Sequence, residues 1–151
     1  DCIYTLKLEF GAYEKVEKLC ALLAQAVALA KSDLAPLSAI AEIGEGWVAE
    51  EAIAIALYCS LKYSDDFRAA LIASVNHSGD SDSTGSLTGN ILGAYIGYDR
   101  IPASLLENLE LTEVIRVLGE DLYALCGTEN NDVCYMENWQ RKYLKADYKL
   151  T

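Results

Sequence analysis

Apolar residues recur at intervals of three and four along most of the chain, which is the period of an amphipathic helix. The clearest stretches are residues 12–31, 47–63 and 111–126. A further helix, rich in small residues, is expected after the polar loop near residue 80. Only Ile3 to Phe10 suggests the alternation of a β-strand. The sequence therefore predicts an all-α protein in which residues 1–151 form a single domain.

Capping and breaking residues mark several of the expected helix ends. The run Ser64-Asp65-Asp66 supplies a cap and favourable charge for a helix that continues to about residue 75. Gly127 is a candidate C-cap, and Pro36 and Pro102 lie between helices. Beyond residue 130 the chain is more polar, so we expect either a weakly packed tail or a terminal helix over Met136–Leu144.

Four glycines recur at every fourth residue after the polar loop, and we call them the glycine stripe. Each glycine inside a helix costs about 0.5–1 kcal/mol relative to alanine. We therefore expect something to approach this face of the helix closely, and tight helix packing is the simplest interpretation. Such packing would also bring the start of the helix into the centre of the domain. The stripe consists of Gly85, Gly89, Gly93 and Gly97.

The acidic balance of the chain narrows the classes of partner. Twelve basic and 23 acidic side chains give a net charge of −11, which argues against nucleic acid and anionic membranes as partners. No apolar run reaches the roughly 18 residues that a membrane-spanning helix needs. We expect a soluble protein with neither a nucleic-acid nor a membrane partner.

The cysteines favour a reducing compartment. Their number is odd and no Cys-x-x-Cys pair occurs, so a disulfide framework and a thiolate zinc site are both disfavoured. We expect buried free thiols in a cytoplasmic protein. The five cysteines are Cys2, Cys20, Cys59, Cys126 and Cys134.

The polar loop before the glycine stripe carries the candidate chemistry. Asp80 and Asp82 are followed at once by the hydroxyls of Ser83 and Thr84. Such an all-oxygen set suits a hard cation such as Mg²⁺, Mn²⁺ or Ca²⁺ better than Zn²⁺. The loop resembles one half of a metal site. The alternative is that these residues only cap a helix, because Asp, Ser and Thr are common N-cap residues.

Three familiar loops share part of this pattern but do not fit it. In an EF-hand beginning at Asp80, the position of the bidentate glutamate would be Ile91. The Asp-x-Asp-x-Thr loop of haloacid dehalogenase-type phosphatases should follow a buried strand, whereas a helical pattern precedes Asp80. A serine esterase needs a later histidine, and His77 is the only histidine in the chain.

The run from His77 to Gly85, followed by the small-residue helix and Ile101-Pro102, resembles the C-terminal metal motif of the ADP-ribosylglycohydrolase family. This family includes ADP-ribosylarginine hydrolases and dinitrogenase reductase-activating glycohydrolase. Gly44–Cys59 resembles the family's Gly-x-Gly loop and the helix after it, and Ile101–Leu109 resembles the segment after its metal helix. Together these blocks cover residues 44–109.

The resemblance implies a compact orthogonal helical fold with a dinuclear Mg²⁺ or Mn²⁺ centre, which binds ADP-ribose and cleaves the glycosidic bond of an ADP-ribosyl conjugate. Asp80, Asp82 and Ser83 would be metal ligands, Asp80 and Asp82 would serve catalysis, and Asp82 would bridge both ions. Gly46 and Trp47 would line the ADP-ribose pocket. The alternative for Trp47 is packing in the core.

The chain also departs from the family pattern. Its members carry a Thr-Asp-Asp run and a His-Gly-His-Pro segment in their N-terminal half, and neither occurs here. We therefore expect a truncated product, an excised fragment or one partner of a split enzyme. Its partners would be an ADP-ribosylated protein or small conjugate, together with a complementing N-terminal half or a second copy. The rival hypothesis is a non-catalytic helical module that binds a ligand or partner and retains a vestigial metal loop.

Overall fold

The structure is a computed structural model that describes residues 2–126 and 140–141. It divides into two compact units, Asp1–Leu106 and Glu107–Thr151, and each is considered by itself. The elements are α1 (Cys2–Phe10), α2 (Val16–Ala30), α3 (Pro36–Ile43), α4 (Ala49–Lys62), α5 (Phe67–Val75), α6 (Ser81–Ile96), the 3₁₀ turn η1 (Tyr98–Arg100), α7 (Ala103–Leu106) and α8 (Thr112–Cys126).

The predicted all-α class is confirmed, since every regular element among the described residues is helical. The suggestion of a strand over residues 3–10 is wrong, because this segment forms α1. Ile3 and Leu6 are its partly buried positions, and their spacing of three residues places them on one helical face. The pattern also missed α3, which begins at Pro36, a position where a helix tolerates proline well.

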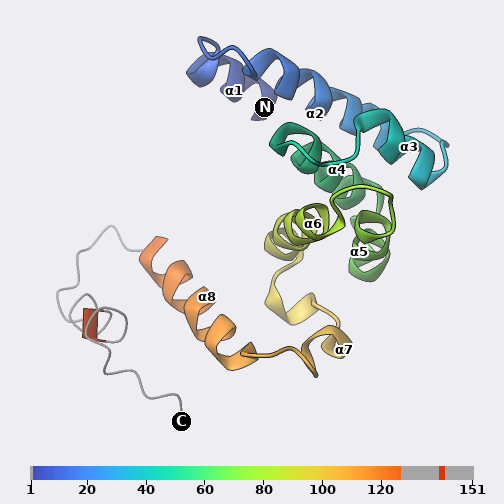
Figure 1. Ribbon diagram of the computed structural model, residues 1–151. Helices are drawn as coiled ribbons and strands as arrows, with labels where there is room; N and C mark the ends of the chain where they lie inside the picture. Colours follow the sequence, from blue (N-terminus) through green and yellow to red (C-terminus); the bar gives the residue numbers. More distant parts are fainter. Residues whose placement is uncertain (1, 127–139, 142–151) are drawn as a thin grey trace. The chain divides into compact units, whose positions relative to one another are not determined.

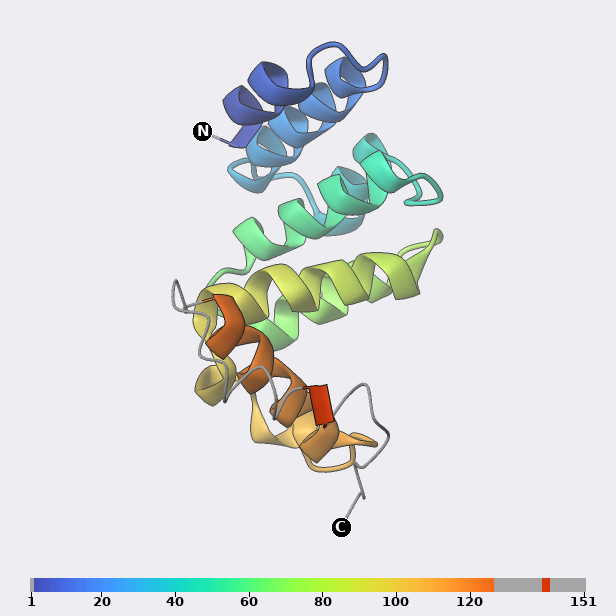
Figure 2. The same cartoon turned by 90° about the vertical axis from the view of Figure 1, so that its left-hand side faces the viewer.

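The helices α1 to α6 of the first unit are arranged in three pairs stacked on one another. Within the pairs, α1 contacts α2, α3 contacts α4, and α5 contacts α6. The middle pair is held from both sides, because α4 contacts α2 on one face and both α5 and α6 on the other (Figures 1 and 2). This central helix therefore links the N-terminal part of the unit to the helix that follows the polar loop.

The core of this unit lies where α2, α3 and α4 meet. Tyr58 and Cys59 on α4 are fully buried, and burial raises the pKa of each side chain to about 12. The Cys59 thiol is therefore protonated and poorly reactive at neutral pH. The buried members of the cluster are Ala26, Leu29, Ala39, Ile40, Ile43, Ala54, Ile55, Tyr58 and Cys59.

The cysteine prediction is correct only in part. Cys20 and Cys59 are free and buried, as expected. Cys2 is free but exposed, because it lies in the first turn of α1, a helix with no buried residue. The side chain of Cys126 and the whole of Cys134 lie outside the described residues. Among the described helices, none is long and apolar enough to cross a membrane.

The predicted start of α5 is confirmed at its cap. Asp66 is the N-cap residue, and its carboxylate accepts a hydrogen bond of 2.9 Å from the Ala69 N–H. The expected C-cap at Gly127 lies outside the described residues. The expected tail or helix over Met136–Leu144 also lies outside them, except for helical residues 140–141.

The glycine stripe on α6 is only partly a packing surface. A Cβ atom on Gly85 would lie 2.6 Å from Cγ1 of Val75, so α5 approaches the helix closely there. At Gly89 the same atom would make an ordinary contact of 3.8 Å. Within the described part of the chain, nothing lies within 4 Å of a Cβ built on Gly93 or Gly97. The expectation of close approach therefore fails for the second half of the stripe.

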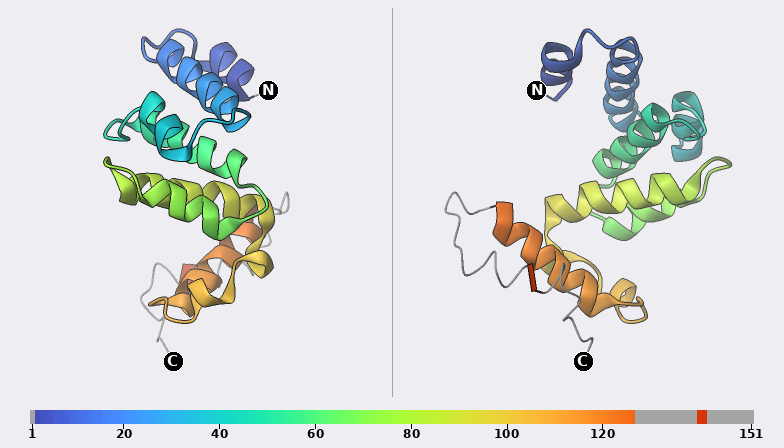
Figure 3. Two further views of the ribbon diagram at one scale, coloured as in Figure 1. Left: turned by 90° about the vertical axis from the view of Figure 1, so that its right-hand side faces the viewer. Right: turned by 60° about the vertical axis from the view of Figure 1, so that its left-hand side comes forward.

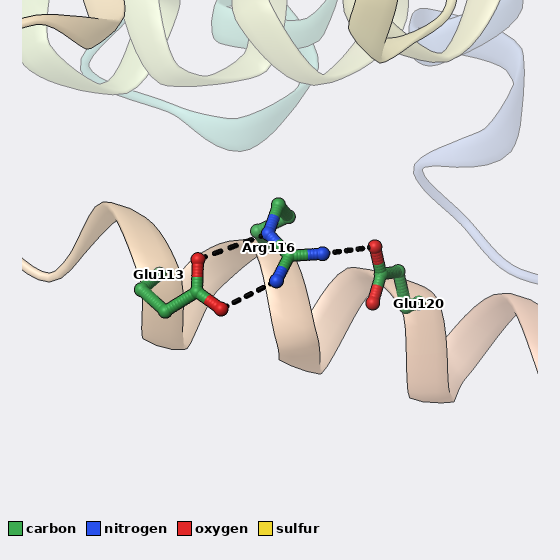
Figure 4. Close-up of polar contacts among 3 residues, drawn as sticks. All are labelled: Glu113, Arg116 and Glu120. Atoms are coloured by element: carbon green, nitrogen blue, oxygen red, sulfur yellow. Dashed lines mark hydrogen bonds and ion pairs between the residues drawn. The ribbon is translucent and has the colours of Figure 1, made fainter. Parts of the chain in front are cut away.

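In the second unit, α8 carries a network of charged side chains on its surface. Arg116 forms ion pairs with Glu113, one turn before it, and with Glu120, one turn after it (Figure 4). These pairs raise the pKa of Arg116 and lower the pKa of Glu113. Because these side chains are exposed to solvent, the ion pairs stabilise the helix only weakly.

Candidate functional site

The polar loop ends in the first turn of α6. Asp80 is the N-cap residue of this helix, and its Oδ1 accepts a hydrogen bond of 3.3 Å from the Ser83 N–H. The helix cap that the sequence suggested at this loop is therefore present. It does not exclude a metal site, because Asp82 lies in the same turn and its side chain is exposed.

The carboxyl groups of Asp80 and Asp82 lie close together. The pKa of Asp80 is below its usual value, first because of a hydrogen bond with the Asp82 side chain and next because of one with the Ser83 side chain. Burial opposes this shift. The lowered pKa favours an ionised Asp80 carboxylate, and together with the Asp82 side chain and the Ser83 hydroxyl it presents only oxygen donors. The donor set therefore fits a hard cation.

A second loop, the segment Gly44–Val48 before α4, packs directly against the polar loop. The Asp80 N–H donates a hydrogen bond of 2.8 Å to the carbonyl oxygen of Glu45. A Cβ atom on Gly79 would lie 1.7 Å from that same oxygen, so no side chain fits at this position. The two loops lie side by side at one end of the stacked helices (Figures 2 and 3).

Hydrogen bonds of His77 fix the shape of the polar loop. Its Nδ1 accepts a bond of 3.1 Å from the Gly79 N–H, so the ring proton must be on Nε2. Nε2 then donates to Oγ1 of Thr84 at 2.9 Å, and this hydroxyl donates to the Ser74 carbonyl at 2.6 Å. Thr84 is fully buried. Its hydroxyl, which the sequence pattern assigned to the oxygen set, is therefore not available to a cation.

The structure brings part of the predicted site together. Gly46 is buried against α6, where a Cβ atom would lie 3.6 Å from the Asp80 carbonyl oxygen. Trp47 follows it and is 67% exposed, so the alternative of core packing for this ring is wrong. Within residues 2–126 and 140–141, no group of three or more His, Cys, Asp or Glu side chains could hold a metal ion. Among these residues, Asp80 and Asp82 thus form a pair without a third carboxylate.

A cavity of about 330 Å³ lies beside the two loops. Apolar side chains of α3 form one wall, and polar residues of the loops form the other. Neither Asp80 nor Asp82 lines it, so this cavity is distinct from the carboxylate pair. Its lining residues are Leu37, Ile40, Ala41, Gly44, Glu45, Asn76, His77 and Ser78.

Two residues of the site escaped the sequence interpretation. Glu45 acts through its main chain, which no residue pattern reveals. Glu51 accepts hydrogen bonds from the N–H groups of Glu45 and Gly46. The sequence did contain a sign of this role. Glu51 is the third residue of α4, the position from which a glutamate side chain commonly reaches back toward the residues before a helix.

A comparison of the sequence with known protein families identifies the family to which this arrangement belongs. The sequence profile of ADP-ribosylglycohydrolases matches residues 4–132. The chain belongs to the ADP-ribosylglycohydrolase family. The expected family is thereby confirmed, and the all-α fold agrees with a part of its helical domain.

Curated members of the ADP-ribosylglycohydrolase family match the chain over part of its length. ADP-ribosylhydrolase ARH3 of Homo sapiens is 30% identical over 94 residues, which are 56% of this chain and 26% of the relative. ADP-ribosyl-[dinitrogen reductase] glycohydrolase of Rhodospirillum rubrum is 40% identical over 68 residues, 44% of this chain and 23% of the relative. ADP-ribosylarginine hydrolase Tri1 of Serratia proteamaculans is 36% identical over 67 residues, which are 44% of this chain and 18% of the relative.

The chain therefore spans about a quarter or less of the length of these relatives. No solved structure matches it significantly.

Proposed function

We propose that this chain carries the C-terminal part of an ADP-ribosyl hydrolase site, with the polar loop as its metal-binding half. The observation that supports this most strongly is the pair of neighbouring acidic side chains at the start of α6 in a member of this family. The carboxyls are Asp80 and Asp82, and Ser83 supplies the third oxygen. The expected cofactor is Mg²⁺ or Mn²⁺, with two ions in the complete site.

Each of these residues has a distinct role in the proposed site. Asp80 is fixed to α6 by its own cap bond and holds its carboxylate at the helix start. Asp82 is more exposed and is the residue that would bridge two ions. When bound, the ions would supply Lewis-acid chemistry, which polarises ribose hydroxyls and activates water for hydrolysis of the glycosidic bond. Asp80 and Asp82 serve this reaction by orienting the ions and balancing their charge.

The loop before α4 would form the ADP-ribose side of the site. Gly46 packs against the start of α6, and the exposed ring of Trp47 comes next in the chain. An exposed aromatic ring beside a metal loop is suited to packing on a ribose or adenine face. We therefore assign Gly46 and Trp47 to substrate binding.

The substrate would be an ADP-ribosylated protein or a small ADP-ribosyl conjugate. The relatives act, by their names, on ADP-ribosyl-[dinitrogen reductase] and on ADP-ribosylarginine. The complete site would require further ligands from a complementing N-terminal half or from a second copy.

The free thiols of Cys20 and Cys59 support a reducing location, which is the cytoplasm.

One observation favours a second candidate function. Asp80 and Asp82 have no third His, Cys, Asp or Glu partner among the described residues. The second candidate is a non-catalytic helical module. It would bind ADP-ribose or a partner through the same two loops and would retain a vestigial metal loop.

Calorimetric titration and a hydrolysis assay distinguish these functions. The chain is titrated with Mn²⁺ and then with ADP-ribose, and ADP-ribose release from ADP-ribosylarginine is followed by chromatography. Asp80→Asn and Asp82→Asn keep a helix-capping or polar side chain but remove a charge, so each is expected to weaken Mn²⁺ binding about tenfold or more. Asp99→Asn, an exposed site beyond the other end of α6, is the charge-matched control.

Turnover by the chain alone would support the hydrolase and exclude the non-catalytic module. Binding of Mn²⁺ and ADP-ribose without turnover would favour the incomplete site, and turnover restored by an added N-terminal half would establish it. Absence of Mn²⁺ binding by the wild-type chain would contradict the proposed metal-binding half.

A further inference from the structure

Glu51 lies near the start of α4 but directs its carboxylate back toward the loop before the helix. Its Oε2 accepts two hydrogen bonds of 3.2 Å, one from the Glu45 N–H and one from the Gly46 N–H. Val48, the N-cap residue of α4, provides no side-chain cap. Glu51 therefore satisfies two main-chain donors that precede the helix, and it closes the loop on itself.

The absence of a side chain at Gly44 gives this carboxylate its place. A Cβ atom on Gly44 would lie 2.5 Å from Cδ and 2.6 Å from Oε2 of Glu51. The backbone of Gly44 also has a φ of +147°, which L side chains rarely adopt. Both facts show that the loop is shaped around the Glu51 carboxylate.

The hydrogen bonds of Glu51 continue, through the main chain of Glu45, into the polar loop. The peptide N–H of Glu45 donates to Glu51, and the carbonyl of the same residue accepts the bond of 2.8 Å from the Asp80 N–H. Asp80 then caps α6 through its side chain. A single hydrogen-bonded path thus runs from the Glu51 carboxylate, through the main chain of Glu45, to the residue that holds the proposed cation.

The neighbouring Glu50 has a different role. Its carboxylate forms an ion pair of 2.9 Å with Lys18 of α2, and this interaction lowers the pKa of Glu50. Glu50 takes part in none of the three hydrogen bonds that join Glu51, Glu45 and Gly46 to one another and to Asp80. The two adjacent glutamates lie on the same helical turn, but the carboxylate of Glu51 accepts hydrogen bonds from the loop and that of Glu50 pairs with α2.

We infer that Glu51 is a positioning residue, whose carboxylate fixes the Glu45 carbonyl and through it holds Asp80 in place for the cation. The effect on cation affinity rests on the proposed function of the metal loop. The effect on the Asp80 main chain does not, because it follows from the hydrogen bonds of the protein alone.

The first measurement is the exchange rate of the Asp80 amide hydrogen in the full chain, followed by nuclear magnetic resonance. Glu51→Ala is expected to speed this exchange about tenfold or more, since a loop that loses its internal bonds opens more often. Amides of the buried face of α4 should remain unchanged. Glu51→Gln keeps an oxygen that accepts both N–H bonds and should stay within about threefold of wild type. Glu50→Ala is the charge-matched control and should leave Asp80 unchanged.

The second measurement is Mn²⁺ affinity of the same four proteins by calorimetry. Loss of an outer partner of a metal ligand typically weakens binding about 10–100-fold. We expect such a loss for Glu51→Ala, recovery for Glu51→Gln, and wild-type affinity for Glu50→Ala.

An unchanged Asp80 exchange rate in Glu51→Ala would overturn the inference, as would equal effects of Glu51→Ala and Glu50→Ala. The inference would also be overturned if the Asp80 amide exchanged as fast in Glu51→Gln as in Glu51→Ala. Such a result would mean that the charge of Glu51, and not its hydrogen bonds, protects this amide. If the wild-type chain binds no Mn²⁺, the proposed function fails, and the exchange rates still decide the role of Glu51.

Discussion

The two ends of α6 differ in how closely the rest of the protein surrounds them. At the start, the loop before α4 contacts the backbone so tightly that Gly79 has no room for a Cβ atom, and α5 presses on Gly85. At the end, among the described residues, nothing lies within 4 Å of a Cβ on Gly93. Glycines at the same four-residue spacing therefore lie in two different environments, one tightly packed and one open.

This difference shows which glycines matter for the candidate site. Close packing is concentrated where Asp80 must be held, and it diminishes along the helix away from that residue. The last glycine of the stripe has another purpose, because Gly97 is the C-cap of α6 and has a φ of +82°. Substitutions along the stripe should consequently have opposite effects on stability at the two ends.

The largest effect is expected from Gly79→Ala. Its Cβ atom would overlap the Glu45 carbonyl oxygen, a backbone atom that cannot rotate away, so the two loops must separate. Overpacking of this kind costs about 1–3 kcal/mol, and we expect the upper part of that range. Urea unfolding measures the change. Ser78→Ala, in the same loop but exposed, is the control and should stay within about 0.5 kcal/mol of wild type. Equal stability of the two variants would contradict the tight loop contact.

A smaller loss is expected from Gly85→Ala. The new methyl group would lie 2.6 Å from Cγ1 of Val75, which is a side-chain atom and can move. We expect a cost of about 1 kcal/mol, after a small gain in helix propensity offsets part of the overlap. Thermal unfolding followed by circular dichroism measures it, and Gly85→Ser should cost more. A stabilised Gly85→Ala variant would show that α5 does not press on this face.

The smallest effect, and one of opposite sign, is expected from Gly93→Ala. The methyl group meets open space, and alanine is favoured over glycine inside a helix by about 0.5–1 kcal/mol. The variant should unfold at a higher urea concentration than wild type. A loss of stability equal to that of Gly85→Ala would mean that both ends of the stripe are packed alike. This result would contradict the difference in packing between the two ends of α6.

Much of this arrangement could be predicted from the sequence, because local signals agree with it. The helices α2, α4 and α8 follow the apolar period, and Asp66 and Asp80 are side-chain caps of types that sequence alone suggests. The family and the polar loop with its two carboxylates were also recognisable.

Other parts depended on tertiary contacts and were missed. A short helix such as α1 or α3 is marginal by itself and forms because it packs on a neighbour, so its period is hard to read. The hydrogen bond between the Asp80 N–H and Glu45 joins residues 35 positions apart through a main-chain carbonyl, which residue identity does not encode. The glycine stripe was misread because glycine spacing does not say whether a partner or open space lies opposite.

The most direct test of the central claim uses Mn²⁺ as a paramagnetic probe on the isotope-labelled chain. An ion held by Asp80 and Asp82 should broaden the amide signals of Ser81 to Ser83 first. The broadening should fall steeply along α6 toward Tyr95, since a helix of 16 residues is roughly 24 Å long. Asp82→Asn should remove this gradient and Asp99→Asn should preserve it. Broadening that is absent, or that is strongest at the far end of the helix, would contradict a cation site at the start of α6.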